Sequence, residues 1–414
     1  MDLNFFDRIL NIDSTSGREV ELADYLSVEF AAPGRKIDVF EVGDGSKNIL
    51  VSWGVPKVLF CTHLDTVPPY IAPTWKCTGT SAVERAHQCR ATSVSEVLKE
   101  NRSSDGTRHP EDDGMPLGAV SSADWGYTGA SAGYGRGTCD AKGQIFAMYE
   151  ACKELEKNGR DGFGLLLLAG EETGSFGAKA FNAMSLDGVV DEDCVVIVGE
   201  PTDNCMASAA KGTKAFEVNF AGKAFHSGYP EYGISAVEMF NDFVNALRSI
   251  RFPHDPLLGE TTWNIGKLSS DNPQNILSDR LSCRVYFRTT FESDEMVSNI
   301  MKNIAGPEAK LRFGRPKAQD GSDVVGKDVA LWQKLMSVKA LGGDTPTRFE
   351  TLDGFEVKPV SFGSDAPQLT CFRRKILCGP GSILVAHRPD EHIALSDLET
   401  AKQNYISMFN ILHG

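Results

Sequence analysis

The feature that most constrains the fold of this chain is the position of polar motifs directly after short apolar runs. His63, the pair Glu171 and Glu172, and Glu200 each follow such a run. The runs are closed by polar residues or glycine and cover residues 48–53, 57–61, 163–169 and 195–198. Because open α/β sheets bind ligands beyond the carboxyl ends of their strands, these motifs are expected to meet at one edge of a largely parallel sheet.

The segments between these strands favour helices. Residues 141–155 place five apolar side chains on one helical face, namely Ile145, Met148, Tyr149, Cys152 and Leu155. Alternation of such helices with buried strands predicts an α/β layer for the first half of the chain.

The pattern changes at about residue 206. Strands are predicted at 213–220, 261–268, 280–288 and 311–313, with helices at 233–250 and from residue 294. This β-α-β-β-α-β order is that of a ferredoxin-like split unit. The α/β pattern then resumes, with a helix at 329–340, strands at 360–362 and 375–378 and a last helix. The expected division is a first domain at 1–205 and 315–414, with a small domain inserted at 206–314.

A polar stretch at about residues 72–131 fits neither domain. It is rich in Ser, Thr and Gly and lacks sustained periodicity, so it is expected to be a disordered surface insertion rather than a lid. Its His and Cys residues, Cys77, His87, Cys89 and His109, match no strong metal-finger spacing, and a further metal site there is disfavoured.

Composition limits the class of protein. The 414 residues suffice for two domains, and the formal net charge of -14 argues against a nucleic-acid binder. The N-terminus lacks the features of a secretory signal, and no apolar run approaches the roughly 20 residues that span a bilayer. The ten cysteines lack paired spacing. A reducing, cytoplasmic setting without membrane association is therefore expected.

The motifs themselves carry chemistry. They read CTHLDTVP with His63 and Asp65, GRGTCDAKG with Asp140, AGEETGS with Glu171 and Glu172, VGEPT with Glu200, and LVAHRPDEH with His387. Two imidazoles with three carboxylates suit a hydrolytic site for two zinc-like ions, and a further carboxylate remains to handle protons. A single His after a strand is most often packed or solvated, but the joint occurrence of all five motifs favours a site.

These motifs also make the chain resemble the acetylornithine deacetylase and succinyl-diaminopimelate desuccinylase group of di-zinc amidohydrolases and exopeptidases. The resemblance covers nearly the whole chain apart from the insertion. It implies an exopeptidase-like catalytic domain with an inserted ferredoxin-like domain. It also implies that His63 and Glu200 bind one zinc, that Glu172 and His387 bind the other, and that Asp140 bridges both. Co or Mn would tolerate the same ligands.

Two carboxylates are expected to act beside the metal. Asp65 follows His63 by two residues, and we expect its carboxylate to accept the second imidazole N–H of that histidine and so fix its tautomer. Glu171 resembles the general base of the family, which takes a proton from water and returns it to the leaving amine.

Residues of the inserted domain match positions that face the active site in the family. His226 in GKAFHSG would stabilise the oxyanion, often from the partner subunit of a dimer, and Asn275 in PQNILSD would lie nearby. Arg288 is similar to an arginine that binds the substrate α-carboxylate. A surface-loop histidine and a solvated strand-end arginine are the alternatives. Ser364 and Asp365 are weaker candidates for substrate contact.

Two glycines, Gly379 and Gly381, precede His387 and could line the substrate site, because glycine permits close backbone approach.

The resemblance implies a homodimeric amidohydrolase that removes the acyl group of N-acetylornithine, a step of arginine biosynthesis. N-acetylcitrulline, succinyl-diaminopimelate and short dipeptides remain alternative substrates. A catalytically silent, metal-binding relative is the competing class, and the presence of Glu171 beside a metal ligand argues against it.

Overall fold

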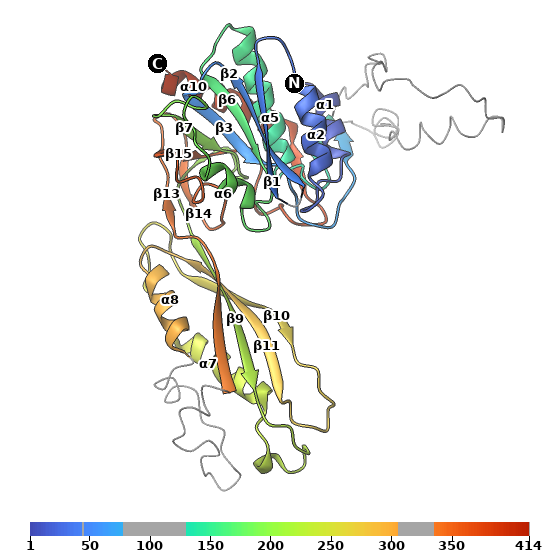
Figure 1. Ribbon diagram of the computed structural model, residues 1–414, viewed down its shortest axis with the longest axis vertical. Coiled ribbons are helices and arrows are strands. Elements are labelled where there is room, and N and C mark those ends of the chain that lie inside the picture. The colour runs from blue at the N-terminus through green and yellow to red at the C-terminus, as the bar shows by residue number, and fades with distance from the viewer. Residues whose placement is uncertain (44, 78–129, 305–334, 414) are drawn as a thin grey trace, which may run out of the picture. The chain divides into compact units, whose positions relative to one another are not determined.

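The computed structural model describes residues 1–43, 45–77, 130–304 and 335–413, and the chain divides into two compact units (Figure 1). The first unit comprises Met1–Met206 and Gln368–Gly414, and the second comprises Ala207–Pro367. The start of the second unit agrees with the expected boundary at residue 206 to within one residue. Its end does not, because the chain returns to the first unit at Gln368 rather than at residue 315.

The first unit is built on a six-stranded sheet with the order β1-β2-β6-β3-β7-β15. The strands are β1 (Lys36–Gly43), β2 (Ser46–Trp53), β3 (Val58–His63), β6 (Phe163–Leu168), β7 (Val195–Val198) and β15 (Arg374–Leu377). Neighbours from β6 to β15 pair in parallel, whereas β1, β2 and β6 pair antiparallel. Strands β3, β6 and β7 are buried along their whole length, which explains their continuous apolar sequences.

The described part of the first unit contains the helices α1 (Leu3–Leu10), α2 (Val20–Glu29), α5 (Lys142–Lys157), α6 (Phe176–Asn182) and α10 (Leu395–His413). Helix α5 contacts α1, α10 and β3, while α6 contacts β1 and β2 (Figure 1). The aromatic rings of Phe6 and Phe146 stack 4.6 Å apart and join α1 to α5. Helix α5 is buried along most of its length, so its N-terminal end is held firmly.

A second, three-stranded sheet in the first unit has the order β16-β5-β4. Strands β4 (Thr74–Cys77) and β5 (Ala130–Tyr134) pair antiparallel, and β16 (His392–Ala394) pairs with β5. The two ends of the polar insertion are therefore brought together. Residues 78–129 between them lie outside the described residues. The disorder expected for that stretch therefore stays a prediction.

The second unit contains a four-stranded antiparallel sheet with the order β10-β11-β9-β12. Its elements are β9 (Gly212–Ala221), α7 (Ala236–Ser249), β10 (Thr262–Ser269), β11 (Arg280–Thr289), α8 (Asp294–Asn303) and β12 (Met336–Gly342). Both helices pack on β9 and β11. Phe216, Val218 and Phe220 alternate along β9 and enter the shared core with Phe243 and Val297. This is the expected ferredoxin-like unit.

The fourth strand of this unit lies later in the chain than predicted. Residues 311–313, where that strand was expected, lie outside the described residues. The helix predicted at 329–340 is wrong over its second half, because Met336–Gly342 forms β12 and pairs with β9. In a short sheet, β8 (Met206–Ala210) at the start of the second unit lies between β13 (Thr347–Arg348) and β14 (Val357–Val360). These pairings keep the chain in the second unit beyond residue 314.

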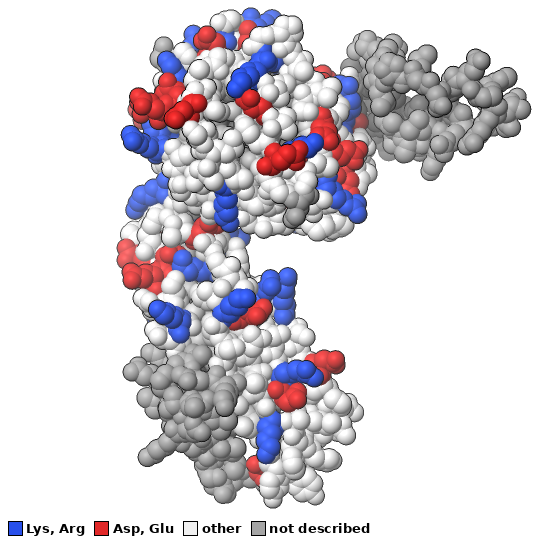
Figure 2. Space-filling view, in the orientation of Figure 1, with Lys and Arg blue, Asp and Glu red and all other residues white. Residues whose placement is uncertain are grey.

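The visible surface carries charges of both signs, and the described cysteines are not joined in disulfides. Basic and acidic side chains are interspersed on the face of each unit seen in Figure 2. Within the described residues, no helix combines the length and the apolar character needed to cross a membrane. The eight cysteines whose side chains the structure describes are free thiols.

Candidate dinuclear metal centre

The carboxyl ends of three parallel strands bring the predicted motifs together in the first unit. His63 is the last residue of β3, Glu171 and Glu172 follow β6, and Glu200 follows β7. Because β6, β3 and β7 are neighbours in the sheet, these side chains lie along one edge of it. The convergence expected from the sequence is therefore present.

Asp140 lies at the centre of this edge, in the loop that precedes α5. Its Oδ1 lies 3.0 Å from Nε2 of His63, and its Oδ2 lies 3.2 Å from Nε2 of His387. The same His387 nitrogen lies 2.9 Å from Oε1 of Glu172. Each oxygen of Asp140 thus faces a different imidazole.

Two sets of side chains could each hold a metal ion, and they share one carboxylate. The first set is His63, Asp140 and Glu200, and the second set is Asp140, Glu172 and His387. Within each set the ligand atoms lie within 4.8 Å of one another. Glu171 belongs to neither set, although its neighbour Glu172 does. The side-chain grouping matches the one that the family resemblance implies.

The donor atoms suit divalent metal. A tetrahedral zinc site with bonds of about 2.0–2.1 Å places neighbouring ligand atoms roughly 3.3 Å apart, close to the separations around Asp140. The first set is buried, whereas the His387 side chain is 48% exposed and Glu172 is half-buried. One side of the centre is therefore open to solvent, as a catalytic metal site requires.

His63 is held by a backbone group rather than by the Asp65 side chain. Its Nδ1 lies 2.8 Å from the backbone oxygen of Asp65, while the Asp65 carboxylate is 3.5 Å away. A carbonyl oxygen only accepts, so Nδ1 carries a proton and Nε2 is the nitrogen available for metal. The predicted tautomer is supported, but the predicted acceptor is wrong, because the turn after β3 points the carbonyl at the ring.

The Asp65 carboxylate instead anchors the turn that carries the two glutamates. It accepts the backbone N–H of Glu171 at 2.9 Å, that of Glu172 at 3.3 Å, and the hydroxyl of Ser16 at 2.8 Å. Asp65 is fully buried, so these bonds fix the direction in which both glutamates leave the backbone. Ser16 was not predicted, and its sequence context offers no signal that it reaches this site.

The charges of the centre shift the pKa values of its histidines. Burial alone would lower the pKa of His63, but the neighbouring carboxylates of Asp140 and Asp65 raise it well above its ordinary value. The hydrogen bonds of His387 with Asp140 and Glu172 raise its pKa to about 10. These carboxylates create a strongly negative potential, and a divalent cation would compete with protons for the same nitrogens.

Three glycines allow the close packing of the segments around the site. Gly170 has a φ of +68°, and a Cβ there would lie 1.7 Å from the ring of Phe176. A Cβ on Gly379 would lie 2.6 Å from the backbone oxygen of Glu200, and one on Gly381 would lie 2.6 Å from Sγ of Cys139. Gly379 therefore permits close packing against the Glu200 backbone, and Gly381 permits close packing against the Cys139 side chain.

Two predicted residues of the second unit lie in adjacent loops. The backbone N–H of Ser227 donates to the oxygen of Asn275, and His226 forms a β-bridge with Ile276. The exposed His226 ring accepts the backbone N–H of Gly228 on Nδ1, at 3.0 Å. Its Nε2 therefore carries the proton and can act as a donor.

Arg288 lies half-buried on β11 of the second unit. A Cβ built on Gly363 would lie 3.8 Å from its Nη1, so the guanidinium is close to the segment that contains Ser364. Ser364 and Asp365 are both almost fully buried. Burial of the Lys211 ammonium lowers its pKa, and the Arg288 charge nearby lowers it further.

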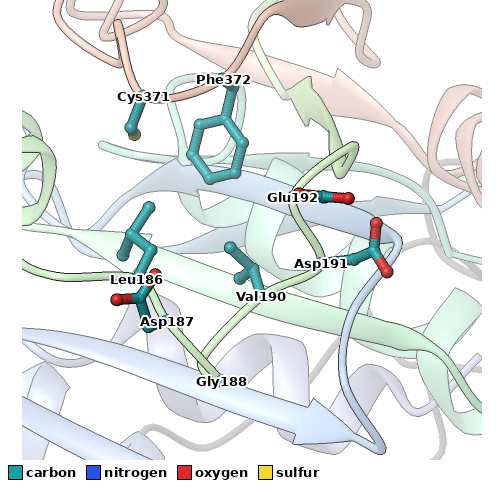
Figure 3. Close-up of a pocket in the computed structure, with 8 residues that line it drawn as sticks. All are labelled: Leu186, Asp187, Gly188, Val190, Asp191, Glu192, Cys371 and Phe372. Atoms are coloured by element: carbon teal, nitrogen blue, oxygen red, sulfur yellow. The ribbon is translucent and has the colours of Figure 1, made fainter.

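A pocket of about 290 Å³ in the first unit is lined by residues that belong to neither ligand set (Figure 3). Its lining residues come before β7 and before β15, and they include Val190, Asp191, Cys371 and Phe372. They are therefore at the amino ends of strands whose carboxyl ends lead to the centre. The further metal site that the sequence disfavours cannot be placed, because His87, Cys89 and His109 lie outside the described residues, as does the side chain of Cys77.

Known proteins are similar to this chain in sequence or in fold. A probable carboxypeptidase of Aspergillus terreus is 28% identical over 442 residues, which cover 97% of this chain and 84% of that protein. A tripeptidase from Staphylococcus aureus has a TM-score of 0.67 at 18% identity, covering 99% of this chain and 97% of its own. A dinuclear metal-binding peptidase of the M20 family from Bacillus subtilis has a TM-score of 0.56 at 11% identity, covering 99% and 97%.

The family model for peptidase family M20/M25/M40 matches residues 113–410. That match contains Asp140, both members of the Glu171–Glu172 pair, Glu200 and His387. The α/β fold, the shared carboxylate between two ligand sets and the match itself agree, and the chain belongs to the metal-dependent hydrolases of peptidase family M20/M25/M40.

Proposed function

We propose that the protein uses two divalent metal ions, most simply zinc, to hydrolyse the amide bond of an N-acyl amino acid, with N-acetylornithine as the first candidate. The observation that carries this proposal is the pair of ligand sets that share Asp140. His63 and Glu200 would hold one ion, Glu172 and His387 the other, and Asp140 both. Bound there, the ions would supply Lewis acidity toward the amide carbonyl and lower the pKa of a water molecule.

The protein's own groups would move the protons. Glu171 is half-buried beside the ligand Glu172, and Asp65 fixes the backbone of both. Glu171 would take a proton from the attacking water and return it to the nitrogen of the leaving amine. His226 would donate its Nε2 proton in a hydrogen bond to the developing oxyanion.

The leaving group is proposed to be an amino acid with a free α-carboxylate. Arg288 is proposed to bind this carboxylate, because a guanidinium binds a carboxylate in bidentate fashion. Ser364 and Asn275 are proposed as further substrate contacts.

A peptide with a free C-terminus is the second candidate substrate. The Aspergillus relative is named a probable carboxypeptidase, and such an enzyme also releases an amino acid that bears a free α-carboxylate. The two candidates therefore share the leaving group and differ in the acyl part, which is a small acetyl group in one and a peptide in the other.

A substrate panel tests the proposal. Metal-loaded and chelator-stripped protein would be assayed for amine release from N-acetylornithine, N-acetylcitrulline, succinyl-diaminopimelate and N-blocked dipeptides. We expect metal-dependent release that is fastest from an N-acetyl amino acid and is lost with its methyl ester, because the ester removes the carboxylate. Cleavage of the dipeptides alone would favour the carboxypeptidase, and no release from any compound would contradict both candidates.

We also propose that the chain forms a homodimer through the second unit. Several apolar side chains are exposed in the loops that hold His226, namely Phe225, Tyr229, Tyr232 and Ile276. Clustered exposed apolar surface is typical of protein interfaces. Light scattering should give twice the chain mass of 45.0 kDa. A monomer with full activity would contradict any contribution of His226 from a partner chain.

A further inference from the structure

A buried carboxylate outside both ligand sets holds the loop that carries Asp140. Glu391 has no exposed surface, and its Oε1 accepts the backbone N–H groups of Gly137, Cys139 and Asp140 at 2.9, 3.1 and 3.1 Å. Its Oε2 accepts Nη1 of Arg136 at 2.5 Å. All four donors come from a single loop of five residues.

The same residue ties this loop to the segment that carries His387. Glu391 follows His387 by four residues, and its backbone oxygen accepts the N–H of Gly135 at 2.9 Å. The Arg136 guanidinium is 2% exposed and also donates through Nε to the backbone oxygen of Pro69. A fixed anion therefore joins two segments that each carry a candidate metal ligand.

We propose that Glu391 is a positioning residue for the metal centre, which directs both oxygens of Asp140 toward the two ions. This inference rests on the metal centre of the proposed function. The Asp140 backbone N–H is itself one of the bound donors, so the position of the Asp140 Cα depends directly on Glu391. Because both ligand sets share Asp140, a shift of this loop would weaken the binding of both metal ions.

Glu391→Gln tests the proposal with little change of volume. The amide oxygen would still accept the three backbone N–H groups, but the amide NH2 would face the Arg136 guanidinium, and two donors would oppose each other. We expect the affinity for Co²⁺ to fall about 10- to 100-fold, which is the usual loss when an outer-shell partner of a metal ligand is changed. Equilibrium dialysis and the visible absorption of bound Co²⁺ would measure this loss without reference to activity.

The double variant Arg136→Met with Glu391→Gln removes the opposing donor and keeps the acceptor for the three N–H groups. It is expected to regain part of the Co²⁺ affinity that Glu391→Gln loses, since the amide that accepts the three backbone N–H groups would then no longer be opposed by a buried guanidinium. This variant also preserves the test if Glu391→Gln alone does not fold. A folded double variant that binds Co²⁺ as weakly as the single one would overturn the inference.

A second ion pair in the first unit, which is half-buried, provides the control. Arg35 and Glu156 are joined at 2.5 Å, and neither belongs to a ligand set. Glu156→Gln should lower the melting temperature and leave Co²⁺ affinity unchanged. If wild type and Glu391→Gln bind Co²⁺ equally well, the role of Glu391 is overturned and the proposed metal centre still stands. If the wild type binds no Co²⁺, the proposed metal centre is overturned and the role of Glu391 with it.

Discussion

Glu171→Gln is expected to keep both metal ions and to lose about 10²- to 10⁴-fold in kcat, the usual contribution of a general base. The amide has the size of the carboxylate but cannot accept a proton from water. The turn should keep its shape, because Asp65 binds the backbone N–H of residue 171 rather than its side chain. Rates under substrate saturation and metal content by elemental analysis would measure both effects.

The neighbouring residue provides a matched control for this variant. Glu172→Gln changes the same chemistry one position along, but Glu172 lies 2.9 Å from His387 in the second ligand set. It should therefore lose one metal ion as well as activity. If Glu171→Gln lost metal to the same extent as Glu172→Gln, the assignment of proton transfer to Glu171 would be wrong.

Asp140→Ala is expected to abolish binding of both metal ions and with it all measurable turnover. The two oxygens of Asp140 face different histidines, and among the described residues Asp140 alone belongs to both ligand sets. We expect an affinity loss larger than the roughly 100-fold upper range of outer-shell changes, because the substituted residue would itself be a ligand. Metal titration into stripped protein would measure this loss.

A variant that removes a ligand from only one set provides a comparison for Asp140→Ala. His387→Ala removes a ligand from the second set only, and the first set of His63, Asp140 and Glu200 stays complete. This variant should retain one tightly bound ion while Asp140→Ala retains none. Equal metal content in the two variants would contradict a bridging role for Asp140.

Much of the centre could be predicted from sequence because its ligands follow strongly patterned strands. Strands β3, β6 and β7 are buried along their whole length, and their apolar runs locate His63, Glu172 and Glu200 at one edge. The core of the second unit was also predictable, since β9 alternates buried and less buried residues at period two and α7 is amphipathic.

The sequence-based predictions failed at positions where the local sequence carries little information about the structure. Strand β12 is exposed over most of its length at the edge of its sheet, so it lacks the apolar alternation of a buried strand. The spacing of His63 and Asp65 could not distinguish a backbone acceptor from a carboxylate, because that depends on the direction of the turn. Glu391 lies inside a recognised motif, but its partners are more than 250 residues earlier in the chain.

A titration of Zn²⁺ into chelator-stripped protein tests the two-metal hydrolase most directly, with bound metal and amine release from N-acetylornithine measured on the same samples. Activity is expected to rise with bound metal and to reach its maximum at two ions per chain, one for each ligand set. Full activity in stripped protein, or two bound ions with no hydrolysis of any N-acyl amino acid or peptide, would contradict a two-metal hydrolase.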